Sequence, residues 1–397
     1  MDQKSSSENS MSDRTPVIVG IGVSDYPIAP HLSERQHHAQ ALQRALADCG
    51  IPKRDIDGFM TFKMQEESEN SVAEYLGINF KVFGGLGVGG ACFEFHVQQA
   101  CAQIRDGQCD TVAITYGSDL YTRMGRSLGT KGAWKASEVN TTSSSFEEVY
   151  GSNIVANYAM ATRRHMHRYG TTSEQLAEIA VAHRFHAGFN PNAMYRDPIT
   201  IDDVVNSSMV ADPLHKLDCC VVSDGGGAVI ITTAERAKAL KTRPVYIHAA
   251  QVGQTHWNIS QMPDFTRTAA ADISPRLFAE AGLTPDDIDT IQLYDSFTIT
   301  ALLLLEDLGF CEKGEGGSFV QGGALRFDGR LPCNTDGGGL SSCHPGMRGL
   351  LLLIEAVRQM RGEAGETQVR DAKFALACGA GGYLSGMGAL ILGKEAP

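Results

Sequence analysis

Short, continuous apolar runs alternate along this chain with segments whose apolar residues recur at helical spacing. Residues 15–23 are rich in valine and isoleucine, which predicts a buried strand. Ser33 and Gln36 then form a capping-box pattern ahead of apolar positions at helical spacing, and Gly50 ends that series. The sequence therefore opens with a strand followed by a helix, which is the first step of an α/β unit.

Two pairs of segments indicate that the order of elements repeats. Ala47–Met60 (ADCGIPKRDIDGFM) aligns without gaps with Ala279–Gln292 (AEAGLTPDDIDTIQ). A weaker similarity links Ala113–Gly117 (AITYG) with Ala375–Gly379 (ALACG), and each of these follows a helical segment. This self-similarity predicts a duplicated α/β fold built from two similar βαβ halves.

The domain organisation follows from this repeat. Residues 1–14 are polar and poor in large apolar groups, which predicts a disordered tail. We expect an N-terminal half over residues 15–243 and a C-terminal half over residues 244–397. Residues 120–220 have no counterpart in the second half and are predicted to form an inserted loop domain. The clearest element of this insertion is a helix over residues 173–186.

Three side chains of the second half stand at predicted strand ends or turns. Tyr294 in LYDSF follows a strand, and its hydroxyl could donate to a carbonyl oxygen or pair with the backbone. His344 in GGGLSSCHPG precedes a helical run and could be a base, an oxyanion donor or an ordinary loop histidine. Cys378 in ACGAGGY ends a strand, either as an exposed thiol or as a buried inert one. Because strand ends in α/β folds gather functional side chains, we expect the three residues to share one pocket.

A glycine-rich turn precedes a helix predicted over residues 93–105. Gly85, Gly87 and Gly90 satisfy the GxGxxG spacing of dinucleotide-binding loops. The motif does not follow the first strand of its half, however, and Asp110 begins the next strand instead of ending it. We therefore interpret the motif as a tight turn that lets a helix N-terminus approach a ligand or a partner.

Composition narrows the classes of function. Thirty-four Lys and Arg against 46 Asp and Glu give a formal net charge of −12, the wrong sign for a nucleic-acid partner. The longest apolar runs reach five residues, whereas a bilayer span needs about 20, so we expect no membrane span. Ten cysteines without a CxxC pair fit a reducing cytoplasm, and we expect no metal site. The helical histidines, His183 and His186 among them, are expected on solvated or capped faces.

Five segments resemble the thiolase superfamily, especially the sterol-carrier-protein-x type and the related lipid-transfer thiolase-like proteins. In family order they are YGTTSEQLAEIAVAHRFHAGFNPNA, LDCCVVSDGGGAV, LYDSF, NTDGGGLSSCHPG and ACGAGG. The resemblance covers nearly the whole chain after the tail and implies a layered αβαβα fold. It further implies carbon–carbon bond chemistry beside a thioester carbonyl, with coenzyme A as part of the substrate and no tightly bound cofactor. In this comparison His344 matches the histidine of the HPxG motif, and Cys378 matches the second cysteine, which moves the α-proton.

Two positions depart from the family pattern. Gly90 stands where the family has its acyl-carrying cysteine, so an acyl-enzyme cannot form at this residue. Cys92 lies two residues later, close to a helix N-terminus where a thiolate is favoured, and could be a shifted nucleophile. Tyr294 replaces the Asn or His of the NEAF or HDCF segment, a change that resembles the thiolase-like aldolases that remove steroid side chains.

Three functional hypotheses follow. In the first, which we favour, the protein is a non-covalent carbon–carbon lyase on an acyl-CoA, in which Tyr294 or His344 stabilises the enolate oxygen. In the second, it is a true thiolase or acyltransferase that uses Cys92. In the third, it is a non-catalytic acyl-CoA or lipid-binding scaffold. The resemblance also implies a homodimer and a small OB-fold and zinc-ribbon partner protein, whereas the residues that bind coenzyme A are not predicted.

Overall fold

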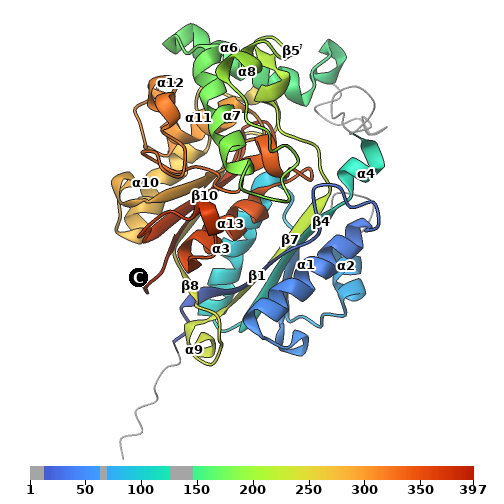
Figure 1. The fold of residues 1–397 in the computed structure, drawn as a ribbon. Coiled ribbons are helices and arrows are strands. Elements are labelled where there is room, and N and C mark those ends of the chain that lie inside the picture. The colour runs from blue at the N-terminus through green and yellow to red at the C-terminus, as the bar shows by residue number, and fades with distance from the viewer. Residues whose placement is uncertain (1–12, 63–68, 126–145) are drawn as a thin grey trace, which may run out of the picture.

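The computed structural model describes residues 13–62, 69–125 and 146–397 and contains a mixed nine-stranded sheet (Figure 1). The strand order is β3-β2-β4-β7-β1-β8-β11-β10-β9. The strands are β1 (Pro16–Val23), β2 (Gly58–Thr61), β3 (Val82–Gly84), β4 (Thr111–Ser118), β7 (Gly225–Thr233), β8 (Val245–Gln254), β9 (Thr290–Leu293), β10 (Phe374–Gly381) and β11 (Gly386–Gly393).

Helices pack around and between the two halves of this sheet. The main ones are α1 (Glu34–Cys49), α2 (Glu69–Leu76), α3 (Cys92–Arg105), α10 (Ala270–Ala281), α11 (Thr298–Asp307) and α13 (Gly349–Arg361), with short helices α9 (Ala234–Ala237) and α12 (Gly316–Phe319). Helix α1 contacts β1, β4 and β7, whereas α10 contacts β8 and β11. Helices α3 and α13 contact strands of both halves and lie in the middle of the molecule (Figure 1). This arrangement gives the layered α/β architecture that the resemblance implied.

The predicted duplication is visible in the element order. The N-terminal half runs β1, α1, β2, α3, β4 and β7, and the C-terminal half runs β8, α10, β9, α13, β10 and β11. The aligned segments Ala47–Met60 and Ala279–Gln292 both lead from the end of a helix into a strand, β2 in one half and β9 in the other. The halves meet where β1 pairs with β8 through Val17 and Tyr246. Equivalent strands thus form one continuous sheet.

The two longest apolar runs of the sequence lie in buried helices. Leu350–Ile354, one of the two longest apolar runs, lies in the first turns of α13 and is at most 6 % exposed. The other run, Ala301–Leu305, lies in α11 and is fully buried. The first turns of α13 are apolar all round and must be covered on all faces, which holds this end of the helix between the two halves of the sheet. Its amino end, Gly349, is thereby held at the centre of the fold.

Local signals predicted several boundaries well and one poorly. Helix α1 ends at Gly50, which has φ +75°, and the Gln36 side chain accepts a hydrogen bond from the Ser33 amide as the capping box requires. Strand β10 continues to Gly381, three residues beyond Cys378, where the sequence predicted its end. The extension depends on glycine, because a Cβ at Gly381 would lie 1.7 Å from the Val88 carbonyl oxygen.

The insertion covers the carboxyl-terminal side of the sheet, at the top of Figure 1. Its elements are α4 (Leu120–Met124), α6 (Ile154–Tyr169), α7 (Ser173–Ala187), α8 (Ile201–Val205) and the hairpin of β5 (Met209–Ala211) and β6 (Leu214–His215). Helix α7 begins with a capping box, in which the Gln175 amide donates to the Thr172 hydroxyl over 3.3 Å. The predicted helix over residues 173–186 is therefore confirmed.

Most of the predicted tail, residues 1–12, lies outside the described residues. Its last residue is anchored, since the Arg14 guanidinium donates to the Ile104 carbonyl over 2.6 Å and pairs with Asp110 at 2.9 Å. No helix in the described part of the chain is both long and apolar enough to cross a membrane.

Candidate active site

Tyr294 and His344 lie together in the centre of the fold. The Tyr294 hydroxyl and His344 Nε2 are 3.1 Å apart, and the two rings meet edge to face. Each residue is 5 % exposed. Tyr294 follows β9 directly, and its amide donates to the Cys378 carbonyl over 2.9 Å, which fixes its backbone against β10. The pair can therefore pass a proton between a phenol and an imidazole in a water-poor site.

Gly90 leaves the space that the Tyr294 ring occupies. A Cβ built on Gly90 would lie 2.4 Å from Tyr294 Cε2, Cζ and Oη, far inside van der Waals contact. Gly90 lies in the short helix η2 (Gly89–Ala91), immediately before α3. A cysteine side chain at position 90 and the tyrosine ring at position 294 therefore exclude each other.

The Tyr294 hydroxyl is placed at helix amino ends. Burial raises the pKa of the phenol well above its ordinary value, so Tyr294 rests as the neutral donor. The backbone amide of Arg348, at the start of α13, acts in the opposite direction through a hydrogen bond to the phenol. Helix amino ends stabilise negative charge, so the ends of α3 and α13 favour an oxyanion that forms here.

His344 is held by the loop that precedes α13. This loop contains the short π-helix η8 (Gly338–Ser342), and the His344 amide donates to the Ser223 hydroxyl over 3.0 Å. Burial lowers the pKa of His344 to about 4. The imidazole is therefore neutral near pH 7, and its Nε2 is free to exchange a proton with the phenol of Tyr294.

A buried carboxylate next to Tyr294 organises the same loop. Asp295 accepts hydrogen bonds from the amides of Gly339 (2.8 Å) and Leu340 (3.1 Å), and from His183 Nδ1 at 2.9 Å. Burial opposes ionisation of Asp295, but its hydrogen bond and charge interaction with His183 and the charge of Arg348 lower its pKa to about 2. Asp295 therefore holds the loop of His344 and the end of β9 in fixed positions.

The placement of His183 corrects the sequence-based expectation. His183 and His186 are both fully buried, not on solvated or capped faces. His186 bridges the Asn334 carbonyl and the Phe327 amide, at 3.1 and 2.8 Å. Buried residues lie on several faces of their helix α7, so the sequence does not show which polar groups of the fold pack against the two histidines. Within the described ranges no group of three metal-ligating side chains converges.

Arg348 completes the charge network beneath the site. Its Nη2 donates to both carboxylate oxygens of Asp336, each at 2.6 Å, and its Nη1 donates to the Cys343 carbonyl over 2.5 Å. The sequence did not indicate a role at the site for Asp295, Arg348 or His183. The available signal was that Asp295 follows Tyr294 directly and that Arg348 lies four residues after His344.

The structure does not bring Cys378 to the Tyr294–His344 pair. In β10, Gly379 faces the side chain of Glu94 on α3, and successive strand residues face opposite sides of the sheet. Cys378 pairs in register with Leu293, not with Tyr294, so its thiol lies on the opposite face from the pair. Burial, followed by the charge of Glu94, raises the pKa of this thiol well above its ordinary value. These features match the inert buried thiol that the sequence left as an alternative.

Cys92 is likewise fully buried, at the first position of α3. Burial and the neighbouring Glu94 carboxyl raise the pKa of its thiol well above the ordinary value, which disfavours a thiolate. Among the contacts of the described residues, none joins Cys92 to Tyr294 or His344. The expected help from the helix N-terminus is outweighed by desolvation.

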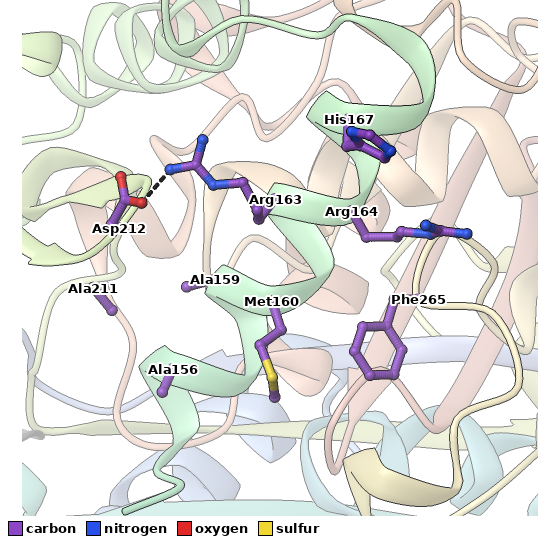
Figure 2. A pocket seen from close by; sticks show the side chains of 9 residues that line it. All are labelled: Ala156, Ala159, Met160, Arg163, Arg164, His167, Ala211, Asp212 and Phe265. Atoms are coloured by element: carbon purple, nitrogen blue, oxygen red, sulfur yellow. Dashed lines mark hydrogen bonds and ion pairs between the residues drawn. The ribbon is translucent and has the colours of Figure 1, made fainter.

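An open groove lies on the insertion, on the outer side of α6 (Figure 2). Its lining combines apolar and cationic side chains and does not include Tyr294 or His344: Ala156, Ala159, Met160, Arg163, Arg164, His167, Ala211, Asp212 and Phe265. Arg163 pairs with Asp212. No ion pair within the described ranges engages Arg164, so its charge is available to a ligand.

Comparisons with known proteins agree with this architecture. The family model described as thiolase C-terminal domain-like matches residues 251–394. A steroid side-chain-cleaving aldolase of Thermomonospora curvata is 36 % identical over 387 residues, which cover 95 % of this chain and 97 % of that protein. A 17-hydroxy-3-oxo-4-pregnene-20-carboxyl-CoA lyase of Mycobacterium tuberculosis is 39 % identical over 355 residues, covering 87 % and 91 % respectively.

Solved structures give the same result. An Ltp2-ChsH2(DUF35) aldolase is similar with a TM-score of 0.86 at 34 % identity, covering 96 % of this chain and 98 % of that one. A monomeric SCP2-thiolase-like protein from Mycobacterium smegmatis, 20 % identical, shares the fold with a TM-score of 0.72 over 96 % of this chain and 78 % of that one. The chain therefore belongs to the thiolase superfamily, as a carbon–carbon-bond-cleaving enzyme of the sterol-carrier-protein-like type that is related to the aldolases.

Proposed function

We propose that this protein cleaves a β-hydroxyacyl-CoA by a non-covalent retro-aldol reaction, with Tyr294 and His344 as its acid–base relay. The observation that carries the proposal is the contact between Gly90 and Tyr294. The position that would hold an acyl group has no side chain, and the space beside it is filled by a phenol 3.1 Å from an imidazole.

In the cleavage step, the β-hydroxyl of the substrate gives its proton to the Tyr294 oxygen while the phenol proton passes to His344 Nε2. The electrons of the O–H bond form the carbonyl of the leaving ketone or aldehyde, and the electrons of the Cα–Cβ bond form the thioester enolate. The backbone amide of Arg348 and the helix ends at Gly90 and Gly349 stabilise the negative charge. His344 can accept the proton because it is neutral near pH 7.

The true thiolase hypothesis has less support. A nucleophile at Cys92 would have to ionise a fully buried thiol beside a carboxyl group, and it has no described contact with the base His344. The scaffold hypothesis leaves the buried Tyr294–His344 pair without a role.

The groove of Figure 2 is our candidate for the phosphates of coenzyme A. Arg163, Arg164 and His167 supply positive charge there, while Met160 and Phe265 supply apolar surface, a mixture that fits a nucleotide with several phosphates. Helix α6 also carries Tyr158, whose ring packs against Phe297 with centroids 4.5 Å apart. One helix would thus connect this groove to the residues that follow Tyr294.

The assembly is proposed from the relatives and the surface. The Ltp2-ChsH2(DUF35) aldolase suggests that this chain also works with a small partner protein, for which we propose an OB-fold and zinc-ribbon architecture. Strand β3 forms one edge of the sheet, and the nearby Phe80 and Leu86 are exposed, which supports pairing with a second copy in a homodimer. All ten cysteines are free, which supports a reducing cytoplasm.

One experiment separates the three hypotheses. The full chain, with any protein that co-purifies from the native host, is incubated with a β-hydroxyacyl-CoA and with a β-ketoacyl-CoA, each with and without free coenzyme A. The proposal expects cleavage of the β-hydroxyacyl-CoA without free coenzyme A and no acyl adduct in the protein mass spectrum. Coenzyme A-dependent cleavage of the β-ketoacyl-CoA with an adduct on Cys92 would establish the thiolase instead. Binding without turnover of either compound would establish the scaffold.

A further inference from the structure

Glu94 is a buried carboxyl that the relay of Tyr294 and His344 does not use. It lies in the first turn of α3, is fully buried, and neither of its oxygens has a hydrogen-bond partner among the described residues. An unpaired buried carboxyl is costly and rare in folded proteins, and such groups call for a specific explanation. Burial raises the pKa of Glu94 well above its ordinary value, which favours the protonated form of the carboxyl.

The space for this carboxyl is made by glycines. A Cβ on Gly379 would lie 2.3 Å from Glu94 Oε2, and a Cβ on Gly349 would lie 2.7 Å from the same oxygen. A Cβ on Gly388 would lie 2.5 Å from Glu94 Cβ. Three backbone segments, from α13, β10 and β11, thus leave room for one acidic side chain.

Glu94 and Tyr294 lie against the same two helix ends. The Tyr294 ring covers Gly90, and its hydroxyl meets the amide of Arg348. A Cβ on Gly349, the next residue, would meet both the Gly90 carbonyl oxygen (2.3 Å) and the Glu94 carboxyl. Gly90, in η2, and Glu94, in the first turn of α3, are four residues apart in the chain. Gly90 therefore lies against the phenol, and Gly349 lies against both the Gly90 carbonyl and the Glu94 carboxyl.

The cleavage reaction needs an acid that this pair does not provide. Loss of the ketone leaves an enolate, whose α-carbon must gain a proton before the acyl-CoA product can leave. Tyr294 and His344 have just taken up the hydroxyl proton, and Cys378, the residue that the family resemblance suggested for α-proton transfer, faces the other side of the sheet. The Glu94 carboxyl, in contrast, lies against Gly379, on the side of the sheet where the Tyr294 ring lies.

We propose that Glu94 is a further catalytic residue, the acid that protonates the α-carbon of the thioester enolate. The inference rests on the proposed retro-aldol function. In the step, the Glu94 O–H bond breaks, its proton forms the new Cα–H bond, and the enolate electrons restore the thioester carbonyl while Glu94 becomes a carboxylate. The proton held on His344 returns through Tyr294 to solvent or to Glu94, so the cycle closes without an oxidant or a further reactant.

Exchange of the α-hydrogens of an acyl-CoA with solvent measures this proton transfer separately from carbon–carbon bond cleavage. The full chain, with any co-purifying partner protein, is incubated with acetyl-CoA in D₂O, and deuterium incorporation is followed by mass spectrometry beside β-hydroxyacyl-CoA cleavage. Glu94→Gln, which keeps the size but has no acidic proton, is expected to lower the exchange rate by about 100-fold or more, the contribution typical of a general acid. Glu355→Gln is the matched control. Glu355 is also buried, but its carboxyl accepts a hydrogen bond from the Thr335 hydroxyl over 2.6 Å, at a place away from Tyr294. Its exchange rate should stay near that of the unaltered protein.

A Glu94→Gln protein that is folded by its thermal midpoint and exchanges within threefold of the unaltered chain would overturn the proposal. If this variant does not fold, the pair Glu94→Asp and Glu94→Asn replaces it. Faster exchange by the Asp variant supports an acid, whereas equal rates would mean a purely structural role. Failure of the proposed function gives a different result, namely no β-hydroxyacyl-CoA cleavage by the unaltered chain in the first place.

Discussion

Substituting Gly90 with alanine tests the central feature of this site, the exclusion between position 90 and the Tyr294 ring. The added Cβ would lie 2.4 Å from three atoms of the Tyr294 side chain, which is closer by 1.0 Å or more than an ordinary contact of 3.4–4 Å. Overpacking of this kind costs about 1–3 kcal/mol. Gly90 does not have a positive φ, so alanine itself fits the backbone there. In a chain without the ring, Gly90→Ala should be neutral or stabilise by up to about 1 kcal/mol.

The double-mutant cycle of Gly90→Ala with Tyr294→Ala should therefore show a coupling free energy of about 1–4 kcal/mol, measured by urea unfolding. Gly386→Ala is the control, because its Cβ would meet nothing closer than 3.5 Å, and its coupling with Tyr294→Ala should stay within about 0.5 kcal/mol of zero. Gly90→Ala alone should also lower turnover by about 100-fold, since a ring displaced by roughly 1 Å loses its alignment with His344. Additive unfolding free energies and normal turnover would refute the steric reasoning.

Four further outcomes test the remaining assignments. Tyr294→Phe should lower the turnover number by about 100-fold or more with an unchanged thermal midpoint, the loss expected for one general acid–base group, and normal turnover would remove Tyr294 from the chemistry. Cys92→Ala and Cys378→Ala should each keep turnover per folded molecule within about threefold, and a large loss in either variant would return its thiol to the mechanism. Because the pKa of His344 is about 4 when folded against 6.5 when exposed, the unfolded chain binds the extra proton between these values. The folded state should then lose up to about 3 kcal/mol from this residue as pH falls from 6.5 to 4, a slope that His344→Gln should remove in urea titrations at several pH values. Arg164→Glu should raise the KM for the acyl-CoA about tenfold with kcat unchanged, and an unchanged KM would exclude the groove as the phosphate site.

The fold could be predicted from the sequence because its signals are local or repeated. The capping box at Ser33 and the glycine at position 50 set the ends of α1 without reference to the rest of the chain. The duplicated segment at 47–60 and 279–292 required only that the same order of elements fold twice. The end of β10 at Gly381 was harder to predict, because the strand reaches this residue through a close backbone contact with Val88 that no local sequence pattern indicates.

The site was only partly predictable, for a physical reason. Tyr294 and His344 stand in motifs at the ends of predicted elements, and these motifs indicated function. The direction of a side chain from a strand depends on register, so a shift of one position reverses its face. Cys378 illustrates this, since it is adjacent to Gly379, which faces α3, and therefore faces away. The burial and the roles of Glu94 and His183 could not be predicted. Whether a polar residue of an amphipathic helix is buried depends on which elements from the rest of the fold pack against it.

The geometry at Gly90 links the loss of a nucleophile to the gain of a relay. Because one volume can hold either a side chain at position 90 or the ring of Tyr294, the site can use a covalent acyl carrier or a phenol 3.1 Å from His344, but not both. In a non-covalent reaction no covalent intermediate takes part of the negative charge of the enolate, so the protein must stabilise that charge through its own contacts. The amino ends of α3 and α13 meet at this volume, and the Arg348 amide already points at the phenol. The same helix ends that would activate a nucleophile thus serve an oxyanion without any change in the backbone.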